Sequence, residues 1–144
     1  MTEPATVAVR SGPSRAFAAL TGLTSLAIFA QAITAGAFIN QPGRQGWVDV
    51  HGMVANAAWV FALVTAVLAV VSFRTLAPAL TGAAVALFVL LIIQTGMGYA
   101  IAGGADGLLI VHVPLALLVF GLTVWLSVRA ALLGRADQAN RAGS

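Results

Sequence analysis

Four long apolar runs, at residues 17–39, 48–73, 79–102 and 108–133, constrain the fold of this chain more than any other feature. A bilayer hydrocarbon core about 30 Å thick requires roughly 20 consecutive helical residues, and each run exceeds that length. Strands of a membrane β-barrel would be about half as long and would alternate in polarity. We therefore predict an all-α membrane protein with four transmembrane helices.

The composition suits a chain surrounded by lipid. Of the 144 residues, 60% are hydrophobic and only 8% are charged, and the mean hydropathy is +1.00. A soluble domain of this size needs more charge to cover its surface. The net charge of +3 comes from scattered arginines, so we predict no nucleic-acid partner. The absence of cysteine excludes disulfides and thiolate metal sites.

Short polar segments separate the four runs. Pro42 and Gly43 predict a turn after the first run, residues 74–78 predict a hinge, and residues 103–107 predict a glycine loop. Because such short connections make neighbouring helices antiparallel, we predict an up-down-up-down four-helix bundle. The expected domains are a flexible tail at 1–15, a transmembrane domain at 16–133 and a disordered tail at 134–144.

The distribution of arginine predicts the orientation of the bundle. Six of the seven arginines are expected on one side, whereas Arg44 is the only one expected on the other. These six are Arg10, Arg15, Arg74, Arg129, Arg135 and Arg141. Because arginine and lysine accumulate on the cytoplasmic side, we predict that both termini are cytoplasmic. The lack of lysine and the abundance of Ala, Gly and Val are typical of high-GC bacteria, so we expect a multi-pass protein of the bacterial cytoplasmic (inner) membrane.

The only two histidines, His51 and His112, lie near the outer starts of the second and fourth predicted helices. At about 1.5 Å rise per residue their depths differ by only a few ångströms, so the two imidazoles could face each other across the bundle. Without a nearby carboxylate pair or cysteine they make a poor zinc or di-iron site, but they form a complete axial set for a haem iron. The alternative is that both are ordinary interfacial side chains.

Further polar residues are candidates for the same site. Arg44 is the one cation available on the outer side to meet haem propionates. Gln31 and Gln94 lie roughly two turns into the membrane, where they either line the cofactor pocket or form interhelical hydrogen bonds. Each glutamine precedes a histidine by about 20 residues, a faint repeat that arose either by duplication or by chance.

Nearby residues of the first three predicted helices have less specific roles. Asn56 has the same two alternatives as the glutamines, and Trp59 packs either against a porphyrin or within the core and lipid. Gly36, Gly96 and Gly98 are expected to allow close approach of helices, either within one chain or between chains.

Four motifs carry a resemblance to known proteins: AQAITAGAF, VDVHGMVANAAW, IIQTGMGYA and LLIVHVPLALLVFGL. They resemble one half of the heme A synthase family and, more closely, a family of small uncharacterised bacterial four-helix membrane proteins. The resemblance covers residues 28–129 and implies haem ligation by His51 and His112. This chain differs from that family in three ways: it corresponds to one half and not two, it lacks the cysteine pair of the outer loop, and it has valine at position 48, where an acidic residue is expected.

We therefore expect a haem b-binding, cytochrome-like protein that acts in electron transfer or haem handling, and no oxidation of a haem methyl group. The alternative is a cofactor-free structural or accessory subunit of a membrane complex. One haem near the outer leaflet cannot carry electrons across the whole membrane. The expected partners are therefore the lipid bilayer and a quinone, a redox partner subunit or further copies of the chain.

Overall fold

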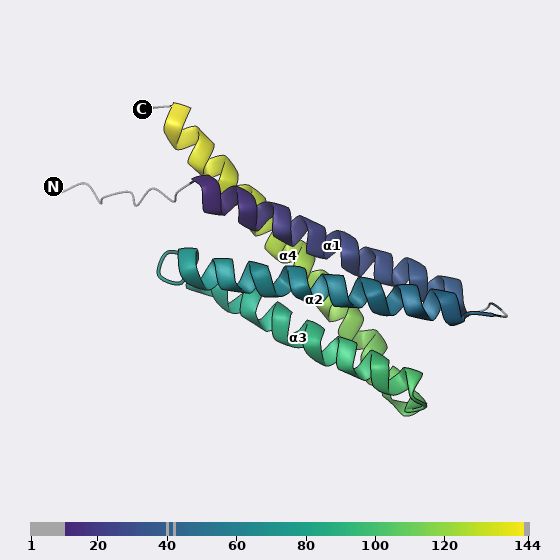
Figure 1. Cartoon of the computed structure of the whole chain (residues 1–144). Coiled ribbons are helices and arrows are strands. Elements are labelled where there is room, and N and C mark those ends of the chain that lie inside the picture. Colours follow the sequence, from purple (N-terminus) through teal and green to yellow (C-terminus); the bar gives the residue numbers. More distant parts are fainter. Residues whose placement is uncertain (1–10, 40, 42, 143–144) are drawn as a thin grey trace.

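A computed structural model describes residues 11–39, 41 and 43–142, which form four long helices (Figure 1). The helices are α1 (Ser11–Ile39), α2 (Gln45–Phe73), α3 (Pro78–Ala102) and α4 (Leu109–Ala142), and a single 3₁₀ turn, η1 (Asp106–Leu108), precedes α4. All four are long and apolar enough to cross a membrane. The prediction of an all-α chain with four helices of membrane-spanning length is confirmed.

The first and last helices extend beyond the apolar runs. α1 begins at Ser11, so residues 11–15 of the expected flexible tail are helical, and residues 1–10 lie outside the described part of the chain. α4 continues to Ala142, through most of the segment 134–144 for which disorder was expected. An apolar run marks only what lipid would cover, whereas a helix continues as long as residues such as Ala, Arg and Gln favour it.

The short connections contain the residues that turns require. Gly43 and Gly104 have φ angles of 80° and 104°, in the left-handed region that glycine enters without steric cost. Pro78 is the first residue of α3, where its missing N–H would have had no intrahelical acceptor. Local residue types therefore determine where one helix ends and the next begins.

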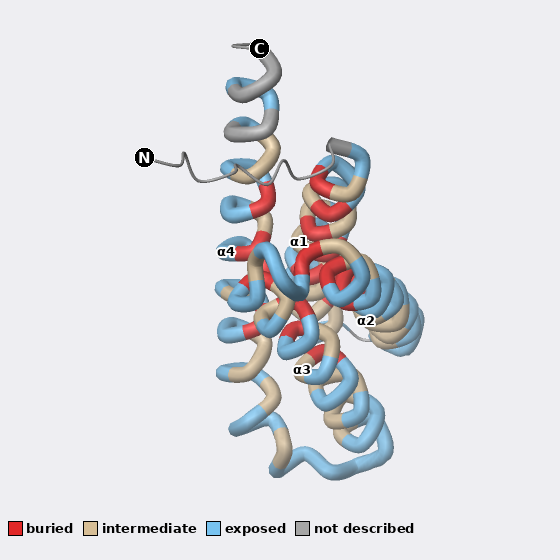
Figure 2. Tube along the Cα trace, turned by 90° about the vertical axis from the view of Figure 1, so that its left-hand side faces the viewer, coloured by how far each residue is buried: buried red, intermediate tan, exposed pale blue. Residues whose placement is uncertain are grey.

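The four helices form a ring in which α1 contacts α2, α2 contacts α3, α3 contacts α4, and α4 contacts α1. Within the described residues, the diagonal helices α2 and α4 have no such contact, and neither do α1 and α3. Figures 1 and 2 show that the α1–α2 pair and the α3–α4 pair lie together near the α2–α3 connection and diverge toward the opposite end.

The buried core occupies only the half of the bundle near the α2–α3 connection (Figure 2). Its apolar members are Phe17, Ile28, Ala58, Ala62, Ala66, Ala69, Phe73, Leu80, Ala84, Leu87, Leu91, Val119, Leu126 and Ala130. We call the other half, which comprises the described residues of 29–57 and 92–118, the divergent half. The one buried residue described there is Thr34, so this half has no buried apolar side chain.

Four buried threonines in the core half are paired within their own helices. Each of four threonines donates a hydrogen bond to the carbonyl one turn earlier, at 2.7–3.0 Å. They are Thr21, Thr24, Thr65 and Thr123. Ser25 and Ser127 add a hydrogen bond of 3.0 Å between α1 and α4. These pairs satisfy polar groups that would otherwise destabilise an apolar interior.

Candidate functional site

Each histidine carbonyl accepts a hydrogen bond from the glutamine of the preceding helix. Gln31 Nε2 on α1 donates to the carbonyl oxygen of His51 on α2 at 2.7 Å. Gln94 Nε2 on α3 donates to the carbonyl oxygen of His112 on α4 at 2.9 Å. The faint sequence repeat thus corresponds to a repeated contact, and both glutamines have the interhelical role that was one of their two predicted alternatives.

The imidazole of His51 is held by side chains of α1. Thr34 Oγ1 lies 2.8 Å from His51 Nδ1, and Thr34 is only 6% exposed. The ring of Phe38 meets the imidazole edge-on, with centroids 5.3 Å apart and an interplanar angle of 85°. Together with the bond from Gln31 to its carbonyl, these contacts fix both the backbone and the ring of His51.

The imidazole of His112 has fewer partners. Its Nδ1 atom is buried without a hydrogen-bond partner, and so is the Oε1 atom of Gln94. The neighbouring residue on α3 is Gly98, where an added Cβ would lie 3.6 Å from Cε1 of the ring. A buried polar atom without a partner typically costs about 1–3 kcal/mol. His112 therefore lies in the less satisfied of two otherwise repeated sites.

Both histidines lie in the divergent half on diagonally opposite helices, and both are half-buried. Among the described residues, no three or more His, Cys, Asp or Glu side chains gather into a group that could hold a metal ion. The site therefore offers two nitrogen donors from opposite sides of the bundle, and not the three or four ligands of a typical zinc site.

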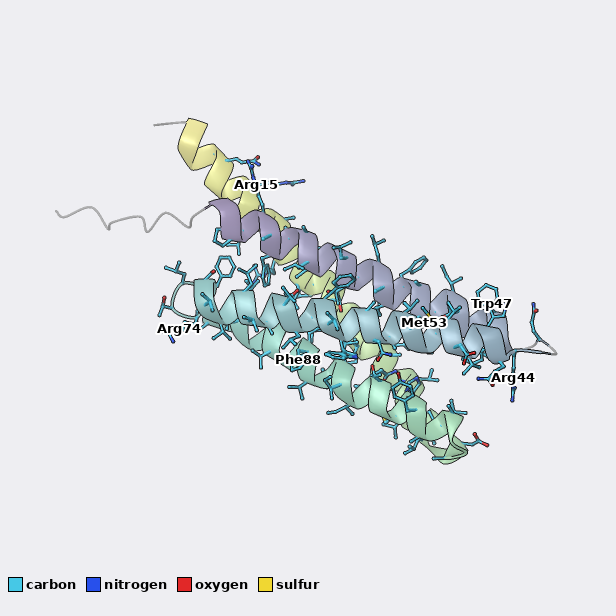
Figure 3. All side chains as sticks on the ribbon, in the orientation of Figure 1. Arg15, Arg44, Trp47, Met53, Arg74 and Phe88 are labelled. Carbon is cyan, nitrogen blue, oxygen red and sulfur yellow. The ribbon has the colours of Figure 1, made fainter. Side chains whose placement is uncertain are left out.

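Arg44 lies apart from the imidazoles, at the tip of the α1–α2 pair (Figure 3). Its carbonyl accepts hydrogen bonds from two backbone N–H groups in the first turn of α2, those of Trp47 at 3.0 Å and Val48 at 3.1 Å. Its side chain is exposed, and His51 follows about two turns, or about 10 Å, further along the helix. The structure thus places Arg44 at the same end of α2 as His51, without a contact between them.

A second polar link joins α2 to α3 in and beside the divergent half. Asn56 Nδ2 donates to the hydroxyl of Tyr99 at 2.8 Å, and Asn56 Oδ1 accepts from Trp59 Nε1 at 3.1 Å. Asn56 therefore forms an interhelical bond, one of its two predicted roles. Trp59 is half-buried and packs against the core, as one of its two alternatives predicts.

Sequence reasoning missed two of the residues that hold His51, and two glycines lie in open space within the chain. Thr34 and Phe38 follow Gln31 by about one and two turns, so their shared helix face was a signal that could have identified them. Gly36 and Gly96 were expected to allow close helix approach, but an added Cβ at either would meet nothing within 4 Å. Within one chain, Gly36 and Gly96 therefore make no close helix contact, because the helix pairs diverge in this half. Packing between chains, the other alternative, stays a prediction.

Comparisons with protein-family models, with curated proteins and with solved structures found no match in any of the three. The fold alone does not define a function, because four-helix bundles serve many purposes. The functional argument therefore rests on the residues of the divergent half.

Proposed function

We propose that this chain is a haem b-binding, cytochrome-like protein with His51 and His112 as the two axial ligands. It is an up-down-up-down bundle in the cytoplasmic membrane of a bacterium, with both termini in the cytoplasm and the histidines toward the outer leaflet. Its role is electron transfer or haem handling.

One observation supports the proposal: the two histidines lie on diagonally opposite helices, in a half of the bundle in which no apolar side chain of the described residues is buried. Four-helix bundles build cofactor sites from side chains on facing helices. Two histidine nitrogens are a complete axial set for haem iron. A planar apolar macrocycle would also supply the buried surface that this half lacks.

The remaining residues of the site have supporting roles. When bound, haem supplies one-electron chemistry. Gln31 and Gln94 fix the backbone of the two ligands through their carbonyl groups. Arg44, at the tip of α2, is the proposed partner of the propionates, since a guanidinium pairs well with a carboxylate.

The orientation and the partners follow from the same arrangement. Arg15 and Arg74 lie at one end of the bundle and Arg44 at the other (Figure 3), which supports a cytoplasmic location for the end that carries more arginine. One haem near the outer leaflet needs a second redox centre to complete electron transfer across the membrane. We propose a quinone, a redox partner subunit or another copy of the chain.

The test is an absorption spectrum of the protein purified in detergent after expression with added haem, first oxidised and then reduced with dithionite. We expect a Soret band with sharp α and β bands on reduction, and loss of these bands in the double variant His51→Ala/His112→Ala. Met53→Ala is the matched control, because Met53 lies on the same helix but is 70% exposed. A colourless wild-type protein that is folded by circular dichroism would refute the proposal.

A cofactor-free structural or accessory subunit is the second candidate. It is favoured by the hydrogen bonds of Gln31 and Gln94 to backbone carbonyls, since such bonds also serve simple helix packing. In that case a helix of a partner subunit covers the divergent half. A colourless wild type, together with unchanged stability in the double histidine variant, would favour this candidate.

A further inference from the structure

We infer that Thr34 is a positioning residue that holds His51 in the tautomer with its proton on Nδ1, which leaves the lone pair of Nε2 free to bind a metal. The metal-binding consequence rests on the proposed function. The tautomer itself is a property of the chain and can be measured without haem.

The inference follows from the number of protons available at Thr34. A threonine hydroxyl has one proton to donate and can accept hydrogen bonds from two groups. Thr34 Oγ1 lies 3.1 Å from the carbonyl oxygen of Ala30 and 3.0 Å from that of Gln31. Carbonyl oxygens can only accept, so the single hydroxyl proton is directed at this pair of acceptors.

The remaining contact of Thr34 must therefore be one in which its oxygen accepts. That contact is His51 Nδ1, at 2.8 Å. The opposite arrangement, in which Thr34 donates to a bare Nδ1, would leave two carbonyl oxygens facing the hydroxyl oxygen without a proton between them. Because Thr34 is buried, water is not available to relieve that repulsion.

This tautomer is the one that a metal-binding histidine needs. A ligating histidine usually donates its other ring N–H to an acceptor, which fixes the tautomer and the direction of the ring. Thr34 supplies that acceptor for His51. His112 has no equivalent, because its Nδ1 is buried without a partner. The two proposed ligands therefore differ, and only His51 has its tautomer and ring direction fixed before a metal binds.

The experiment is ¹⁵N NMR of histidine-labelled, haem-free protein in detergent, in mildly alkaline buffer where imidazole is neutral. The nitrogen shifts distinguish a protonated Nδ1 from a bare one. We expect a single Nδ1–H form for His51, a mixture of tautomers in Thr34→Val, and the wild-type spectrum in Thr34→Ser, which keeps the hydroxyl. Signals are assigned in a His112→Ala background.

Thr24→Val is the matched control. Thr24 is also buried on α1 and bonds a carbonyl one turn earlier, Leu20 at 2.8 Å, but it lies in the core half away from both histidines. It should leave the histidine signals unchanged. A His51 ring with bare Nδ1 in the wild type, or an unchanged tautomer in Thr34→Val, would overturn the inference.

The haem-loaded protein gives a second readout. Loss of a group that orients a metal ligand typically reduces affinity by about 10–100-fold. We expect a weakening of this size in a haem titration of Thr34→Val, with normal affinity in Thr34→Ser and Thr24→Val. Equal affinity in Thr34→Val and wild type would contradict the positioning role. If no form of the protein binds haem while the NMR result holds, the proposed function fails and the tautomer assignment stands.

Discussion

His51 and His112 occupy corresponding places in the two halves of the chain, but different residues hold them. His51 has a hydroxyl at Nδ1 and a phenyl ring against its imidazole, whereas the His112 ring borders a glycine and has an unpaired Nδ1. The repeated glutamine contacts place both backbones in the same way. The chemical difference between the two sites therefore comes from side chains that the repeat does not share.

The two glutamines should differ in what they contribute to stability. Hydrogen bonds between membrane helices average about 0.6 kcal/mol and reach about 1.7 kcal/mol. We expect Gln31→Met to destabilise the haem-free protein by about this amount. Gln94→Met should cost less, because it also removes the buried and unpaired Oε1 atom. Unfolding in detergent measures both, and equal losses would contradict the unpaired state of the Oε1 atom of Gln94.

Gly98 sets how much space the His112 ring has. An added Cβ at 3.6 Å from Cε1 makes only ordinary van der Waals contact, so Gly98→Ala should preserve folding and haem binding. Gly98→Leu should displace the ring and reduce haem occupancy severalfold. Gly96→Leu is the control, because nothing lies within 4 Å of a Cβ there. Similar haem spectra for the two leucine variants would argue against His112 as a ligand.

Some of these residues could be predicted from the sequence and others could not. Histidine and glutamine stand out in an apolar run because an unpaired polar group there is costly. Thr34 does not stand out, because this chain buries several threonines that bond only their own helix, as Thr24 and Thr65 do. The helix spacing places Thr34 on the same face as Gln31, but only the packing of α1 against α2 reveals its contact with His51.

At the scale of helices, α1 and α4 are held together by a hydroxyl pair as well as by apolar packing. Ser127 donates to the carbonyl of Thr123 at 2.9 Å, so Ser25 is the donor in the 3.0 Å bond between Ser25 and Ser127. The order of the helices in the ring brings the first and last helices into contact, which closes the bundle in its core half.

A double-mutant cycle on Ser25→Ala and Ser127→Ala should give a coupling energy near 0.6 kcal/mol, the average for such bonds in membrane proteins. The single and double variants are compared by unfolding in detergent. Thr81→Ala provides a second site for comparison, since Thr81 Oγ1 donates more weakly to Ala69 across α2 and α3, at 3.3 Å. A coupling of zero would mean that the serines are merely adjacent.

The existence of the helices could be predicted because bilayer thickness and backbone hydrogen bonding allow few other solutions. Their ends could not, since α4 extends to Ala142 through residues that are polar but favourable for a helix. The divergence of the two pairs was also not predictable. It depends on where small residues such as Ala58, Ala62 and Ala69 let α2 pack tightly, and hydropathy carries no such information.

At the scale of the whole molecule, the orientation in the membrane can be tested directly because the chain has no cysteine. Gly46→Cys and Thr75→Cys introduce single exposed thiols near the α1–α2 and α2–α3 connections. We expect a membrane-impermeant maleimide to label position 46 on intact spheroplasts, and position 75 only after permeabilisation. The reverse pattern would place the histidines near the cytoplasm and contradict the proposed orientation.

Because the core lies at one end of the bundle, the residues that stabilise the fold are separate from the residues of the candidate site. The edge-to-face pair of Phe17 and Phe73, with centroids 5.5 Å apart, belongs to an end that is complete without any ligand. Under the proposed function, the chain can therefore close at this end first and receive haem afterwards through the opposite one. Assembly would then be a sequence of two separate events, and substitutions in the divergent half need not destabilise the haem-free protein.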